Sequence, residues 1–369
     1  MWWRASCIER EFVDGSGINP SREQVCRDNL APMVESERID WLDGWRAIAV
    51  GVVIVSHLFH VYGAQFAFPG KFGVFIFFSI SGYIVTKLLL REFTRTGKVD
   101  VAGFYFRRAA RILPPLLIYL LFCIVISTNS ATFFGSFRAL MFSCNVNIPI
   151  FDCGWTFGHT WSLAFEEQYY LLLPAIFAPK FRIFLCLIVP LAVLPLIWPI
   201  TWIGRIGFLQ IYALLAFGAL YARFELKIAS SLAKVPAAIS TALLLLSAGW
   251  TSLPPSGWQF LTGLLVPPAI GIGIFAIPLS SKRARAILGS SPMRRVGLYS
   301  YTLYLWQQLA LSPAPWNVGV VPIVGLVGAL GFAAISYYTV ESYIRGKARA
   351  WLARKSERRP EVSTAIAAN

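Results

Sequence analysis

Residues 46–63 read RAIAVGVVIVSHLFHVYG. Ten apolar or small residues separate Arg46 from His57, and no other lysine, arginine, aspartate or glutamate occurs in the stretch. A helix needs about 20 mainly apolar residues to cross the hydrocarbon core of a bilayer. The stretch therefore predicts a membrane-spanning helix that carries a histidine within it.

Similar apolar stretches recur along the chain, which has 369 residues, 57% of them hydrophobic and 14% charged, with a mean hydropathy of +0.62. A soluble domain is about 25% charged because its surface meets water, so the composition excludes soluble, disordered and coiled-coil proteins. We predict an all-α, polytopic membrane helix bundle. Its spans, about ten in number, are expected at 46–63, 72–90, 112–130, 161–179, 183–200, 206–222, 235–250, 259–280, 297–312 and 319–340.

The net charge of +15 arises from 33 lysines and arginines, and all but three of them cluster in alternate connections and at the two ends. Ten spans with both termini cytoplasmic place these clusters inside and leave Lys71, Arg138 and Arg205 outside. The positive-inside rule predicts this distribution for a multi-pass membrane protein. The basicity therefore reflects topology, and we expect a lipid bilayer rather than a nucleic acid as partner.

The chain divides by composition into a polar N-terminal extension (1–38), a membrane domain (39–343) and a basic cytoplasmic tail (344–369). We expect the working chain to start near Met33. Prolines within several spans remove backbone donors, so these helices are expected to kink or break; they are Pro114, Pro115, Pro190, Pro195, Pro267 and Pro268. Cys144 and Cys153 share one predicted external loop, where they either form a disulfide or are two unrelated thiols.

His57 is the strongest candidate for chemistry, because polar side chains inside a membrane are costly and mark functional sites. Eleven residues place it about 16 Å deeper than Arg46. A neutral imidazole there can take a proton from a hydroxyl near pH 7; the alternative is a packing role. A zinc site with His60 and His159 is a further interpretation, but no carboxylate joins them at helical spacing, and we expect no metal.

A second polar group opens the fourth predicted span, where residues 158–170 read GHTWSLAFEEQYY. Adjacent helical side chains point about 100° apart, so Glu166 and Glu167 cannot share one task. We expect one of them to orient an imidazole, as a triad acid does, and the other to pair with an arginine. The alternative is a polar cluster between helices that only stabilises the bundle.

Two further stretches carry polar groups. In the predicted inner loop 104–115, Arg108 and Arg111 lie one turn apart and present a fork of guanidinium groups suited to phosphate, although positive-inside anchoring explains loop arginines equally well. Residues 298–308 pack hydroxyl and amide groups into the ninth span, where an aromatic belt is the alternative interpretation.

These motifs resemble the acyltransferase-three family of membrane O-acyltransferases. Asp43-Gly44-Trp45-Arg46 with His57 is similar to the family's Asp-Gly-Leu-Arg opening and Arg-x10-His motif. Four other segments are similar to family motifs: Gly73–Tyr83, Arg108-x-x-Arg111, His159–Tyr170 and Tyr301–Trp306. The five motifs occur in the family's order between about 40 and 343. Trp45 replaces the usual Leu, and Gln307 stands where many members carry His.

The resemblance implies transfer of an acyl group, usually acetyl, from acyl-CoA to a hydroxyl of a polysaccharide, lipopolysaccharide or lipo-oligosaccharide in a bacterial inner membrane. Acyl-CoA would be a co-substrate, with no permanently bound cofactor. No second, esterase-like module follows the last predicted span, so we expect the branch without it.

On this interpretation His57 is a general base or a transient acyl acceptor. We expect Asp43 or a glutamate to hold its tautomer, and Arg46 to bind the CoA arm or neutralise an acid. The inner arginines Arg107, Arg108 and Arg111 would bind CoA phosphates, and His159, Glu166 and Glu167 would form the outer mouth. The remaining candidates for substrate contact are Ser81, Trp161, Ser162, Tyr170, Tyr301, Tyr304 and Gln307.

A multipass transporter or flippase of a glycolipid or polysaccharide precursor is the rival prediction, because proline-interrupted spans with polar residues at mid-membrane also describe one. Against it, the two halves of the chain show no matching motif positions. A purely structural membrane subunit would leave His57 and the glutamate pair without a role.

Overall fold

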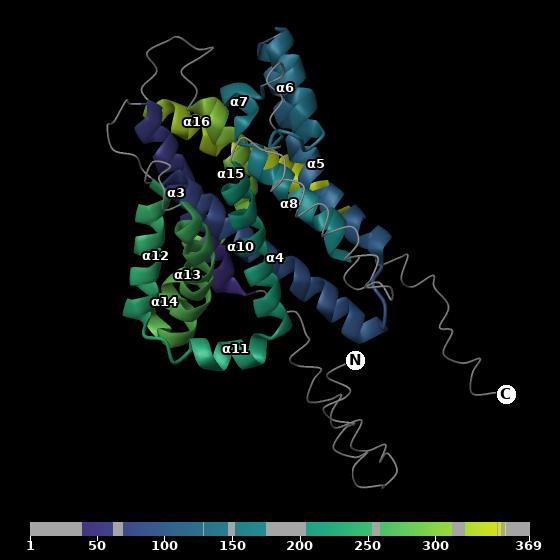
Figure 1. The fold of residues 1–369 in the computed structure, drawn as a ribbon. Helices are drawn as coiled ribbons and strands as arrows, with labels where there is room; N and C mark the ends of the chain where they lie inside the picture. Colours follow the sequence, from purple (N-terminus) through teal and green to yellow (C-terminus); the bar gives the residue numbers. More distant parts are fainter. Residues whose placement is uncertain are drawn as a thin grey trace, which may run out of the picture. The chain divides into compact units, whose positions relative to one another are not determined.

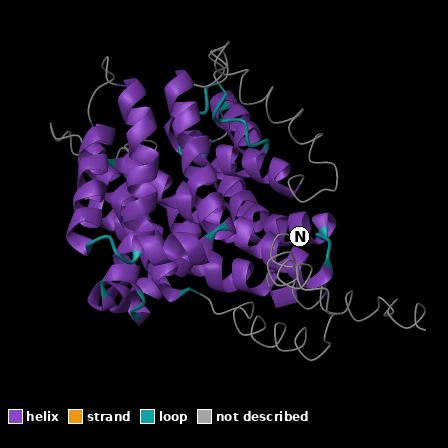
Figure 2. Ribbon diagram, turned by 60° about the horizontal axis from the view of Figure 1, so that its bottom comes forward, coloured by secondary structure: helices purple, strands orange, loops and turns teal. Residues whose placement is uncertain are grey.

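The computed structural model describes residues 39–61, 69–127, 129–146, 152–174, 204–252, 259–311, 322–344, 346–347 and 351. Within these residues every regular element is helical (Figures 1 and 2), which confirms the predicted all-α class. The predicted span 183–200, the extension 1–38 and most of the tail after 344 lie outside the described residues.

Four of the described helices are long and apolar enough to cross a membrane. They are α3 (Asp40–Val61), α4 (Gly70–Thr96), α5 (Val101–Ile126) and α13 (Gln259–Ser280). Each contains one of the predicted spans in whole or in large part. The count of ten and the cytoplasmic placement of both ends stay predictions.

Other predicted spans correspond to shorter helices. These are α8 (Trp161–Leu172), α10 (Gly204–Arg223), α12 (Ala237–Ser252), α15 (Ser291–Ala310) and α16 (Pro322–Ser336), the last continuing as the π-helix η2 (Tyr337–Glu341). The connections contain further helices that the hydropathy pattern did not predict: α6 (Ser130–Leu140), α7 (Gly154–Gly158), α11 (Glu225–Leu232) and α14 (Lys282–Leu288).

The prediction of an inner loop at 104–115 was wrong, because these residues belong to α5. The helix begins after Asp100, whose carboxylate accepts a hydrogen bond from the backbone N–H of Gly103 at 3.2 Å and so caps the helix N-terminus. α5 also continues through Pro114 and Pro115, and α13 through Pro267 and Pro268, so none of these prolines ends its helix.

Helices α3 and α15 run in the same direction and pack closely along their length. At one end Arg294 donates to Asp40 at 3.0 Å. One turn further, a Cβ on Gly297 would collide with the Asp43 carbonyl, so the backbones touch there because the residue is glycine. At the other end His57 of α3 contacts Gln307 of α15.

The other helix pairs have consistent directions. α4 is parallel to α10, with Tyr83 beside Tyr221 and Lys87 paired with Glu225 at 2.9 Å. α5 is antiparallel to the α7–α8 segment, since the Tyr105 hydroxyl donates to the Leu171 carbonyl and the Tyr119 hydroxyl to the Thr156 carbonyl. These are the relative directions that the predicted order of spans gives to the same segments.

Candidate active site

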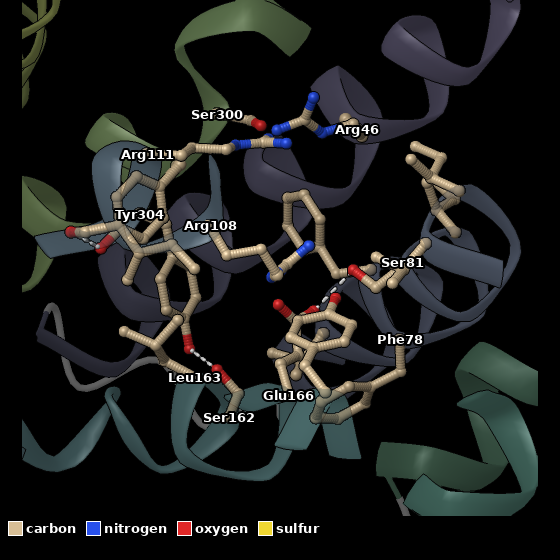
Figure 3. Close-up of a pocket in the computed structure, with 18 residues that line it drawn as sticks. Arg46, Phe78, Ser81, Arg108, Arg111, Ser162, Leu163, Glu166, Ser300 and Tyr304 are labelled. Atoms are coloured by element: carbon tan, nitrogen blue, oxygen red, sulfur yellow. Dashed lines mark hydrogen bonds between the residues drawn. The ribbon is translucent and has the colours of Figure 1, made fainter. Parts of the chain in front are cut away.

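Helices α3, α4, α5, α8 and α15 surround a cavity of about 90 Å³ (Figure 3), enough to hold several ordered water molecules or the polar atoms of a ligand. Aliphatic and aromatic side chains form much of its wall. Its polar lining residues are Arg46, Ser81, Arg108, Arg111, Ser162, Glu166, Tyr170, Ser300, Tyr301 and Tyr304. All of these except Ser300 were predicted as site residues from the sequence.

The two adjacent glutamates have different partners, as the 100° rule predicts. The Ser81 hydroxyl donates to Glu166 Oε1 at 2.8 Å, which places Glu166 in the cavity wall. Glu167 Oε1 lies 3.5 Å from Arg108 Nη2. The Arg108 guanidinium also lies 3.4 Å from the centre of the Tyr170 ring, a cation–π contact. Arg108 is therefore held inside the bundle by an anion and an aromatic face.

The three predicted CoA-binding arginines do not act as one group. Arg108 and Arg111 lie one turn apart on α5 and both reach the cavity. Arg107 points elsewhere and pairs with Glu92 at 3.1 Å, with its side chain 45% exposed. The structure thus separates Arg107 from the candidate site because adjacent residues on a helix face different directions.

One end of the cavity is strongly basic. Figure 3 shows Arg46 of α3 and Arg111 of α5 at the same end as Ser300 of α15. Arg46 contacts Asp43 one turn earlier at 3.4 Å, so Asp43 supports Arg46 rather than lining the cavity. Ser300 is fully buried, and its hydroxyl has no hydrogen-bond partner among the described residues.

The opposite end of the cavity is closed by Tyr304 and Ser162, whose hydroxyl oxygens lie 2.8 Å apart. The Tyr304 hydroxyl donates its one proton to the His159 carbonyl at 2.7 Å. The Ser162 hydroxyl has two acceptors within reach, the Tyr304 oxygen at 2.8 Å and the His159 carbonyl at 3.3 Å. The Ser162 oxygen keeps its lone pairs for a ligand in the cavity, and no base lies within hydrogen-bond distance to activate it among the described residues.

His57 does not line the cavity. Its ring Nδ1 lies 2.7 Å from Gln307 Oε1. Gln307 is fully buried, and its Nε2 lies 3.4 Å from both the Tyr304 carbonyl and Gln308 Oε1. Both neighbours are acceptors, so the amide nitrogen faces them and the amide oxygen faces His57. Nδ1 consequently carries the proton, and Nε2 is left with a lone pair.

This arrangement corrects the prediction that Asp43 or a glutamate holds the tautomer of His57. Asp43 lies more than three turns earlier on α3, and Glu166 and Glu167 are bound to Ser81 and Arg108. Gln307, predicted as a substrate contact, fills the orienting position instead. It lies three residues beyond Tyr304 on α15, so His57 is about one turn past the closed end of the cavity.

An indole covers the histidine pair. The Trp155 ring centre lies 5.5 Å from that of His57 and 5.1 Å from that of His60, on which it stacks. Trp155 is fixed by Gln308, because its Nε1 donates to the Gln308 carbonyl and the Gln308 amide donates to the Trp155 carbonyl. Sequence reasoning missed Trp155, whose only signal was its place four residues before His159.

His159 is buried against the rings of Tyr119 and Tyr304, with centres 5.7 and 5.4 Å away. Its buried ring also interacts with the Thr156 backbone. Trp161 packs on Phe78 and Phe165 and stays outside the cavity. The described part of the chain contains no group of three or more His, Cys, Asp or Glu side chains placed to hold a metal ion.

The loop between α6 and α7, predicted to be external, is fastened on two sides. Cys144 and Cys153 form a disulfide, the first of the two alternatives that the sequence left open. Asn145 exchanges hydrogen bonds with Gln168 of α8 at 2.8 and 3.2 Å. The loop is therefore tied to the helix that carries Glu166 and Glu167.

Another polar contact that the sequence analysis missed lies at the middle of α15. Glu341, in the π-helix η2, is 1% exposed and accepts a hydrogen bond from the buried Thr302 hydroxyl at 3.0 Å. A carboxylate at the end of an apolar stretch was the available signal. Its position behind the cavity wall makes it a support for α15.

The chain belongs to the acyltransferase family whose sequence model is described as an acyltransferase domain, and that model matches residues 39–340. This establishes the resemblance that the five motifs indicated, and the match begins one residue before α3.

Among curated proteins, the chain is similar to the O-acetyltransferase OatA of Staphylococcus aureus strains NCTC 8325 / PS 47 and COL. It is 29% identical to each over 364 residues, which cover 86% of this chain and 59% of each relative. The chain thus spans less than two thirds of the length of these relatives. No solved structure matches it significantly.

Proposed function

We propose that this protein is an integral-membrane O-acyltransferase of the bacterial inner membrane. It moves an acyl group, acetyl in our proposal, from cytosolic acyl-CoA to a hydroxyl of an exported or surface glycan or glycolipid. The proposal is supported by the family membership and by the name of the relatives, which are O-acetyltransferases.

One observation carries the proposal: an imidazole with a fixed tautomer lies about one turn beyond the end of a cavity lined by three arginines. The arginines suit an anionic donor that enters from the Asp40 end of α3. The lone pair on His57 Nε2 suits a hydroxyl acceptor that approaches from the His60 end, beside Trp155. Donor and acceptor then meet at one ring.

The reaction follows from this arrangement. His57 Nε2 takes the proton of the acceptor hydroxyl while its oxygen attacks the thioester carbonyl. The carbon–sulfur bond breaks, and the proton passes to the departing thiolate, which leaves as CoA thiol. In the alternative order, Nε2 itself attacks the thioester and forms an acyl-imidazole that the acceptor hydroxyl then resolves.

The thioester must pass Tyr304 and Ser162 to reach His57. Tyr304 is held at this point by two neutral hydrogen bonds, with Ser162 and with the His159 carbonyl, and each contributes only about 0.5–1.5 kcal/mol net. We therefore propose that Tyr304 rotates aside when a donor fills the cavity. Arg108, held between Glu167 and Tyr170, keeps the wall in place.

The test is mass spectrometry of surface glycans from cells that have the gene, lack it, or carry His57→Ala, together with acetyl-CoA turnover by the purified full chain. We expect an acetyl mass shift only with the wild-type chain, and CoA release only when glycan acceptor is present. The proposal would be refuted by glycans that have the same mass in all three strains together with CoA release that does not depend on the acceptor. Intact-mass spectrometry of the protein incubated with acetyl-CoA but no acceptor separates the two orders, since only the second order leaves an acetyl group on His57.

A further inference from the structure

The basic end of the cavity contains a buried hydroxyl without a partner. Ser300 is 0% exposed, lines the cavity and has no hydrogen-bond partner among the described residues. A buried polar group left unsatisfied costs free energy, so such groups are rare in native proteins and call for an explanation. Ser300 has Arg46 and Arg111 at the same end of the cavity (Figure 3).

These three donors come from three different helices, α3, α5 and α15, and all line the cavity. Three arginines and one glutamate line the cavity, so its lining has an excess of positive charge. Guanidinium groups and a hydroxyl, all donors to an oxyanion, are the groups that recognise phosphate. The arrangement fits an anionic oxygen placed between α3 and α15.

A ligand bound at this end must be long enough to reach His57. Along α3, Arg46 and His57 are eleven residues apart, about 16 Å of rise; along α15, Ser300 and Gln307 are seven apart, about 10 Å. A pantetheine arm has about 13 covalent bonds from its thioester sulfur to its phosphorus. At about 1.1–1.2 Å per bond in an extended chain, the arm spans about 14–16 Å.

We propose that Ser300, Arg46 and Arg111 bind the phosphate that joins the pantetheine arm to the rest of the donor. The inference rests on the proposed function, because it assigns the donor's phosphate to a place in the same site. With its phosphate held there, the arm is long enough to run through the cavity, past Ser162 and Tyr304, and to bring its sulfur to His57.

The first experiment measures binding of CoA, 4′-phosphopantetheine, pantetheine and 3′,5′-ADP to the purified full chain in lipid nanodiscs. Hydrogen bonds to charged groups are worth about tenfold or more in affinity. We expect Ser300→Ala to weaken CoA and 4′-phosphopantetheine by about tenfold and to leave pantetheine and 3′,5′-ADP unchanged. Arg111→Gln should weaken the same two ligands further.

Ser240→Ala is the matched control, because the Ser240 hydroxyl is also fully buried and unpartnered among the described residues but lies outside the cavity. Each alanine removes an unsatisfied buried hydroxyl, so neither variant should lower the melting temperature. Only Ser300→Ala should lower affinity. This combination separates a ligand-binding hydroxyl from a structural one.

Three results would overturn the inference: unchanged 4′-phosphopantetheine affinity in Ser300→Ala, an equal loss for pantetheine, or a loss confined to 3′,5′-ADP. Acetyl-CoA and an acetylated carrier protein both carry the phosphopantetheine arm, and a comparison of the two as donors identifies which of them the protein uses. S-acetyl-N-acetylcysteamine lacks the phosphate, so its transfer should not change in Ser300→Ala. If binding follows the expected pattern but no donor acetylates glycan, the phosphate site stands and the proposed function fails.

Discussion

Replacement of Gln307 by leucine tests whether this residue orients the imidazole of His57. Leucine fills a similar volume but cannot accept the Nδ1 proton of His57, which Gln307 Oε1 accepts at 2.7 Å. The ring then loses the contact that fixes its tautomer and rotation. His57 itself remains, so we expect turnover to slow without being abolished.

The size of the effect follows from the bond that is removed. A neutral hydrogen bond contributes about 0.5–1.5 kcal/mol net, and each 1.36 kcal/mol in the barrier is about tenfold in rate. Gln307→Leu should therefore lower kcat by roughly 2- to 13-fold, with more loss if Nε2 becomes the protonated nitrogen. Loss of His57 as general base costs about 10²–10⁴-fold, so the two variants should differ clearly.

The assay is acetyl-CoA turnover by purified variants with a glycan acceptor. We expect kcat to fall while KM for acetyl-CoA stays constant, because Gln307 does not line the donor cavity. Gln307→Glu keeps an acceptor oxygen for Nδ1 and should restore part of the rate. A Gln307→Leu variant with wild-type kcat, or with a changed KM alone, would refute the orienting role.

Three further predictions concern other parts of the site. His57→Ala should remove nearly all acetylation of surface glycan while the protein still inserts in the membrane; mass spectrometry showing near-normal acetylation would contradict this. Arg108→Ala should lower the melting temperature, since breaking a buried ion pair by removing one partner costs about 3–5 kcal/mol, and adding Glu167→Gln should recover part of the loss; a wild-type melting curve for the single variant would count against it. Cys153→Ser should make the loop between Cys144 and Cys153 more sensitive to proteolysis, because closing a loop of about ten residues is worth about 2.7 kcal/mol; cleavage at the same rate as in the oxidised wild-type chain would show that the hydrogen bonds to α8 are enough to hold the loop.

The sequence predicts the helices well where hydropathy alone decides. The spans at 46–63, 72–90 and 112–130 correspond to α3, α4 and α5, because a lipid-facing segment must be apolar over the whole thickness of the bilayer. The prediction from hydropathy fails in the connections between the spans. α6 begins after Asn129, which accepts from the Thr132 N–H at 2.7 Å, and α14 after Ser281, which accepts from the Ala284 N–H. Both caps are visible in the sequence, but a search for apolar runs passes over them.

The site was predictable residue by residue but not in its arrangement. The costs of polar side chains in a membrane identify His57, Arg108 and Glu166 without any knowledge of their neighbours. Which of them meet depends on helix packing between segments 250 residues apart, as in the contact of His57 with Gln307. A glutamine in an aromatic-rich span has no spacing that marks it as the partner of a histidine.

The basic end of the cavity, the Tyr304–Ser162 contact and His57 follow one another along the site because two parallel helices carry them. α3 supplies Arg46 and His57, and α15 supplies Ser300, Tyr304 and Gln307 on one side, so the same pair of helices forms the basic end, the closure and the imidazole in sequence. Because Gly297 brings the α15 backbone against Asp43, this alignment is set at one end and carried along both helices. A shift of one turn would move Gln307 by about 5.4 Å and separate it from His57. The close approach of α3 and α15 therefore fixes the position of the imidazole relative to the cavity, and a bulky residue at Gly297 should disturb transfer even though it lies far from His57.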